Sequence, residues 1–171
     1  METSPIVNVA TVAESGGVEG HFGAFDKVLT PTMRARGGKL GVVQVRVPPQ
    51  TAACPFHHHA LEDEVFFVLS GRGALRYGDA VYDLAPGDCV SCPAGTQTAH
   101  QVANTSDTDD LVYLAIGPHE PHEVCGYPDS GKVMVRSLRA VGTLARTDYM
   151  HGEPEVPAVF AMASARVPAE E

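Results

Sequence analysis

Residues 55–73 read PFHHHALEDEVFFVLSGRG, in which three histidines precede an acidic cluster and an apolar run. Residues 64–69 are mostly aromatic or β-branched and end at Ser70-Gly71, which is typical of a strand followed by a turn. Successive side chains of an extended chain point to opposite faces, so His57 and His59 share a face and His58 points the other way. Glu64 shares a face of its own strand with Phe66. One carboxylate and two imidazoles can therefore meet between two adjacent strands.

A mixed nitrogen and oxygen donor set of this kind suits divalent transition metals. The sequence offers a further donor downstream, where residues 87–95, GDCVSCPAG, precede His100 and Asn104. Glu62 is the alternative carboxylate if the turn before the strand is arranged differently.

Together these stretches resemble the two motifs of the cupins, a superfamily of small β-barrels. In the first motif, four residues separate His59 from Glu64 and six separate Glu64 from Gly71. The second motif is carried by Gly87, Pro93, Gly95, His100 and Asn104. It departs from the usual pattern because four residues instead of two separate Gly95 from His100.

The resemblance implies an all-β fold, a single cupin barrel of the double-stranded β-helix or jelly-roll type. It also implies one divalent transition metal held by His57, His59, Glu64 and His100. Fe(II) is the favoured ion, while Mn, Zn, Ni and Cu are compatible with the same ligands.

The rest of the chain agrees with a barrel, because short strand-like runs alternate with Gly/Pro turns and no long helix or internal repeat is evident. Such runs lie at 40–47, 73–77, 80–84, 89–92 and 111–116, and around His100. We expect an N-terminal arm at 1–25, the barrel at 26–136 and a docking tail at 137–171.

Two later segments are similar to parts of a subgroup of small bacterial cupins, some of them labelled sugar-phosphate-isomerase-like. They are YPDSGK at 127–132 and TDYMHGE at 147–153. The alternative is that both are structural, the first as a turn and the second as part of the docking tail.

Composition limits the function classes. The net charge of −9 over 171 residues argues against nucleic-acid binding and against anchoring to anionic membranes. No apolar run reaches membrane-spanning length and no secretory signal is evident, so we expect a cytoplasmic protein. The four cysteines do not suggest a disulfide framework, and Cys89 and Cys92 should face opposite sides of a strand.

These features predict a metal-dependent enzyme that acts on a small molecule inside the barrel, of the dioxygenase type if the ion is iron. The alternatives are an isomerase or lyase, or a cupin that binds a small ligand without catalysis. Phe66 and Tyr113 are candidates for substrate binding. Gln44 and Arg46 join them only if the polar face of residues 40–47 looks into the barrel and not into solvent. The acid–base residue is not identified, and the cupin resemblance implies a homodimer.

Overall fold

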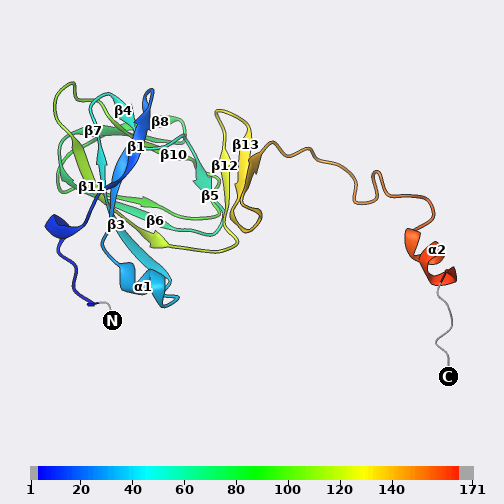
Figure 1. Cartoon of the computed structure of the whole chain (residues 1–171). Helices are drawn as coiled ribbons and strands as arrows, with labels where there is room; N and C mark the ends of the chain where they lie inside the picture. Colours follow the sequence, from blue (N-terminus) through cyan, green and yellow to red (C-terminus); the bar gives the residue numbers. More distant parts are fainter. Residues whose placement is uncertain (1–3, 166–171) are drawn as a thin grey trace.

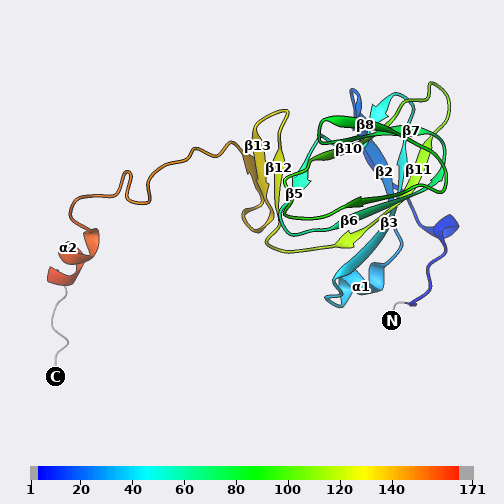
Figure 2. The ribbon, with the colours of Figure 1, turned by 180° about the vertical axis from the view of Figure 1, so that it is seen from behind.

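Short, mostly antiparallel strands form a barrel in a computed structural model that describes residues 4–165 (Figure 1). The larger sheet has the strand order β8-β7-β10-β4-β2-β3-β11-β6-β9, with β1 paired to β2 beside this path. A smaller sheet, β14-β13-β12-β5, lies at one end of the barrel (Figure 2). The strands are β1 (Ser15–Glu19), β2 (Phe22–Val28), β3 (Leu40–Val47), β4 (Thr51–Ala52), β5 (His58–His59), β6 (Glu64–Ser70), β7 (Gly73–Tyr77), β8 (Ala80–Leu84), β9 (Cys89–Cys92), β10 (His100–Asn104), β11 (Leu111–Pro118), β12 (Val124–Tyr127), β13 (Lys132–Val135) and β14 (Ala140–Gly142).

The all-β fold class predicted from the sequence is confirmed. The strands expected at 40–47, 73–77, 80–84 and 89–92 have the observed bounds, and β11 continues two residues beyond the expected 116. Helical segments are short: η1 (Val9–Thr11), α1 (Pro31–Ala35), η2 (Arg136–Leu138) and α2 (Ala158–Ser164). None of the helices in residues 4–165 has the length and apolar character needed to cross a membrane.

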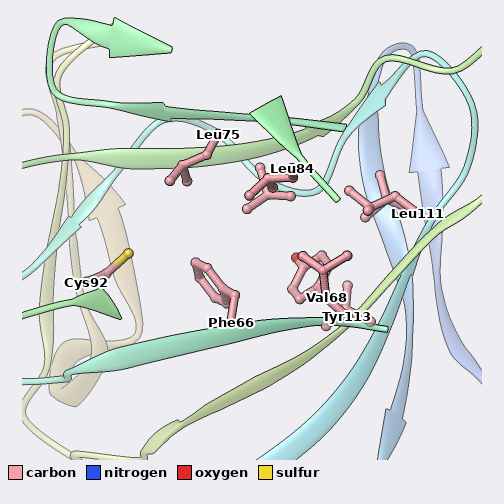
Figure 3. Packing of buried hydrophobic residues seen from close by; sticks show 10 residues of the cluster. Phe66, Val68, Leu75, Leu84, Cys92, Leu111 and Tyr113 are labelled. Atoms are coloured by element: carbon pink, nitrogen blue, oxygen red, sulfur yellow. The ribbon is translucent and has the colours of Figure 1, made fainter. Parts of the chain in front are cut away.

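The barrel interior is filled by alternate residues of the strands, because side chains of period two meet on the concave face. Val47 of β3 and Leu111 of β11 lie opposite each other and are fully buried. Figure 3 shows Phe66, Val68 and Tyr113 in the same interior. This packing fixes the register of β3, β11 and β6, since a one-residue slip would expose every one of these side chains.

Gly71 turns the chain between β6 and β7 and is held close to the loop before β11. Its φ is +82°, and a Cβ atom there would lie 2.2 Å from the carbonyl oxygen of Asp110. Glycine is therefore required at this position both by backbone conformation and by the approach of a second segment.

The bounds expected for the arm and the tail stay predictions, and the elements near them are as follows. The arm boundary expected at residue 26 falls inside β2, which begins at Phe22 and pairs with β3. The expected tail leads away from the barrel (Figure 1), and every described residue from 137 to 165 is exposed. The first part of the tail forms β14, which pairs with β13 in the smaller sheet, and the described residues after β14, 143–165, are all exposed.

Candidate metal centre

Four side chains meet near the end of the barrel where β5, β6 and β10 approach one another. His57 forms a bridge with His100, the first residue of β10, through two backbone hydrogen bonds of 3.1 and 2.7 Å. His59 ends β5 and Glu64 begins β6. Strand pairing thus brings together residues that are up to 43 positions apart in the sequence.

The donor atoms of these four residues lie within 4.8 Å of one another. Nε2 of His57 is 3.0 Å from Nε2 of His59, and Oε2 of Glu64 is 2.9 Å from Nε2 of His100 and 3.2 Å from Nε2 of His59. Ligand atoms around one ion bound at about 2.1 Å lie roughly 3.0–3.4 Å apart. The spacing and the chemistry of the donors therefore fit a single divalent transition metal.

The second ring nitrogen of each histidine has a different environment, and that of His57 leaves its Nε2 free for an ion. Nδ1 of His57 lies 2.9 Å from the carbonyl oxygen of Pro55, which can only accept, so Nδ1 donates the proton. Nδ1 of His59 lies 3.4 Å from Sγ of Cys125. Nδ1 of His100 is buried and has no hydrogen-bond partner among residues 4–165. Such contacts to the second nitrogen set the tautomer of a metal-binding histidine.

The protonation of the cluster is uneven. Burial, aided by His100 and His59, lowers the pKa of His57 to about 4. Burial also opposes the charged form of Glu64, but hydrogen bonds from His100 and His59 outweigh it and hold the pKa of this carboxyl well below its ordinary value. For His59, burial is outweighed by the contacts with Cys125 and Glu64, which raise its pKa to about 10. An ion that binds here displaces a proton from His59, so acid weakens binding.

A second layer of charges behind His59 was not predicted as such. Glu123 is fully buried, and its carboxylate accepts backbone N–H groups from Ala60, Leu61 and Val124 at 2.8–3.1 Å. His59, Glu123 and Cys125 also bring donor atoms close together. The oxygens of Glu123 are occupied by backbone donors, two of which, Ala60 and Leu61, belong to the turn directly after His59. Glu123 therefore orients this turn and, through it, His59.

Glu62, the alternative carboxylate, is also buried and does not belong to the four-donor group; its Oε2 lies 3.7 Å from Nδ1 of His59, behind the ring. It forms a two-point ion pair with Arg136 and accepts the backbone N–H of Glu120 at 2.6 Å. Only the contacts across the fold reveal this role, since nothing in the local sequence distinguishes Glu62 from the solvated acids around it.

A cavity of about 240 Å³ is lined in part by three of the four donor residues, His57, Glu64 and His100. Phe66 and Tyr113, two of the expected substrate-binding residues, line it as well. A wider space of about 530 Å³ shares Glu64 and Ala115 with it as lining residues. A small molecule in the wider space would therefore contact Glu64, one of the four donors.

Gln44 and Arg46 do not line this cavity, so their candidacy for substrate binding is corrected and the solvent-facing alternative for this side of residues 40–47 holds. Val45, between them on β3, lines the cavity, so its neighbours point outward. Arg46 binds Glu14 and Asp110 at 2.9 and 3.1 Å and covers the ring of Phe25. The valines occupy the interior because burying them is favourable, whereas an inward Arg46 would lose its partners.

The segment at 127–132 forms the turn between β12 and β13, which agrees with the structural alternative for it. It also touches the centre, because the ring of Tyr127 stacks on that of His57 with centroids 6.0 Å apart. Asp129 pairs with Arg76 at 2.7 Å.

His58 packs against Gly126 of β12, away from the donors as expected. His119 and His122 belong to neither donor group found among residues 4–165.

Comparison with known proteins agrees with this geometry. A family profile described as a cupin domain matches residues 43–117. The chain carries a cupin domain. Beta-conglycinin beta subunit 1 of Glycine max is 37% identical over 86 residues, which are 47% of this cupin but 19% of that relative. The aligned part thus spans about a fifth of that protein's length.

Two solved structures cover most of the chain. A candidate sugar phosphate isomerase from Acidithiobacillus ferrooxidans is 26% identical, with a TM-score of 0.66 over 95% of this cupin and 93% of that chain. A sugar phosphate isomerase of the cupin superfamily from Silicibacter pomeroyi is 25% identical, with a TM-score of 0.69 over 84% of this cupin and 98% of that chain.

Proposed function

We propose that this cupin is a metal-dependent enzyme that isomerises a small oxygenated molecule inside the barrel. The observation that carries the proposal is the convergence of three imidazoles and one carboxylate beside a cavity, with Glu64 also lining a wider space. Pockets that combine an apolar lining with a few converging polar groups are typical of small-molecule sites.

His57, His59, Glu64 and His100 would hold the ion through three nitrogens and one oxygen. When bound, a divalent ion supplies Lewis-acid polarisation of a substrate oxygen. The chain contributes the surroundings: Phe66 and Tyr113 form an edge-to-face pair with ring centroids 5.4 Å apart and cover one wall. This wall excludes water beside the donors, and polar interactions strengthen in such an environment.

The names of the two structural relatives favour the isomerase alternative over the dioxygenase type expected from the sequence. Dioxygenase activity stays a prediction that requires Fe(II) as the bound ion. A ligand-binding role without catalysis is the remaining alternative, and a homodimer and a small-molecule partner are also predictions.

The test begins with the metal content of protein purified without added metal, beside the double variant His57→Ala/His59→Ala. About one equivalent in the wild type and none in the variant supports the centre. The loaded protein is then assayed with aldose and ketose phosphates and, separately, for oxygen uptake. Isomerisation supports the proposal, while oxygen uptake with iron would replace it by the dioxygenase. Absence of metal from the wild type would refute it.

A further inference from the structure

Asp26 brings a carboxylate to the cavity that His57, Glu64 and His100 line. It lies on β2 opposite Val45 of β3, and both residues line the cavity together with Ala24. The neighbours of Asp26 lie on the other face of β2: Phe25 lies under Arg46, and Nζ of Lys27 donates to the carbonyl oxygen of Val9 at 3.3 Å. The alternation of β2 therefore agrees with an inward side chain at position 26.

Within residues 4–165 the carboxylate of Asp26 has no hydrogen-bond or ion-pair partner. Ser15 Oγ donates to the backbone carbonyl of Asp26 at 3.5 Å and does not reach the carboxylate. The surrounding wall combines polar groups with apolar residues that include Ala24, Val45 and Ala53. The titratable groups that share the cavity are Cys54, His57, Glu64, His100 and Tyr113. Asp26 is half-buried, and ionisable groups that line a cavity with perturbed pKa values are concentrated at functional sites.

The other groups of the cavity are poorly suited to accept a proton. Burial raises the pKa of the Cys54 thiol to about 12 and that of the Tyr113 phenol well above its ordinary value, so both stay protonated near neutral pH. His57, Glu64 and His100 belong to the donor cluster. Burial also raises the pKa of Asp26, which brings a carboxylate closer to the range in which it can both take and return a proton.

We propose that Asp26 is the residue that moves a proton on a substrate held beside the donor cluster, a role that rests on the function proposed above. Its carboxylate takes a proton from the carbon next to the substrate carbonyl: the C–H bond breaks, an O–H bond forms on Asp26, and the electron pair moves onto the carbonyl oxygen. Asp26 then returns the proton to the former carbonyl carbon, while one proton passes between the two substrate oxygens. The carbonyl group has moved by one carbon and no oxidant is needed.

The experiment compares wild type with Asp26→Asn, which keeps the shape of the side chain but cannot accept a proton. Asp83→Asn, the same change at an exposed position of β8, is the matched control. Metal content is measured first and should be equal in all three. Exchange of carbon-bound hydrogen is then followed by NMR in D2O with dihydroxyacetone phosphate and the aldose and ketose phosphates as probes. General acid–base groups contribute roughly 10²- to 10⁴-fold, so Asp26→Asn should slow exchange by that factor with little change in KM.

A second readout does not depend on turnover. Aspartate labelled with ¹³C at the carboxyl carbon should give one resonance that titrates above the exposed aspartates and that Asp26→Asn removes. Exchange at the wild-type rate in Asp26→Asn, or an Asp26 resonance that titrates with the exposed residues, would overturn the role of Asp26 while leaving the metal-dependent enzyme intact. Wild-type protein that binds metal but exchanges carbon-bound hydrogen of none of the probes would overturn the proton-transfer role. Wild-type protein that contains no metal would instead refute the proposed function.

Discussion

Replacement of Glu123 by glutamine tests whether the charges behind His59 hold the centre in place. Glu123 is fully buried, and one carboxylate oxygen accepts the N–H groups of Ala60 and Val124 while the other accepts that of Leu61 at 3.1 Å. In Glu123→Gln one oxygen becomes an NH2 group. At least one of these buried N–H groups then faces a donor in place of an acceptor.

The expected cost follows from these contacts. A hydrogen bond to a charged group contributes about 1.5–3 kcal/mol, and a buried donor left without an acceptor costs about 1–3 kcal/mol. Because solvent does not reach Glu123, we expect the free energy of unfolding of the metal-free protein to fall by about 2–4 kcal/mol. Since Ala60 and Leu61 directly follow His59, metal affinity should also fall, by roughly 10-fold to 100-fold.

Urea unfolding in the presence of a chelator measures the first quantity, and competition titration with Zn²⁺ measures the second. Glu155→Gln, the same change at an exposed position of the tail, is the control and should alter neither. A Glu123→Gln variant within about 0.5 kcal/mol of wild type would refute the energetic reasoning. A destabilised variant with unchanged zinc affinity would refute the claim that Glu123 orients His59.

Two further predictions concern pH and the turn at Gly71. The metal-free protein should be most stable near pH 6.5. Below this pH its stability falls toward pH 4, because His57 is buried in its neutral form with a pKa of about 4. Above this pH the stabilising contribution of charged His59, whose pKa is about 10, is lost as the pH rises to 10. Unfolding in chelator from pH 4 to 10 checks this, and stability that keeps rising to pH 10 would contradict it. Gly71→Ala should lower the free energy of unfolding by more than about 1 kcal/mol beyond the loss caused by the control Gly131→Ala. Both glycines have positive φ, but only at Gly71 would a Cβ atom meet backbone atoms. Equal losses of the two variants in thermal unfolding would show that the contact with Asp110 is unimportant.

The strands and the donor set could be read from local pattern. The β-branched and aromatic runs between Gly/Pro turns predict β3, β7, β8 and β9 with their observed bounds. The parity of His57 and His59 and the spacing to Glu64 anticipate a shared face, and the resemblance to the second cupin motif adds His100. These features depend on neighbours within a few residues, where alternation along an extended chain is reliable.

The facing of β3 and the partners of the buried acids depended on the tertiary fold. Both faces of residues 40–47 are chemically plausible, and only packing of Val45 against the barrel interior turns Gln44 and Arg46 outward. Asp26 fell at the expected arm boundary, yet the pairing of β2 with β3 carries its side chain into the cavity. Register is set by burial summed over whole strands and by contacts far apart in the chain, and a single residue of slip reverses every side chain.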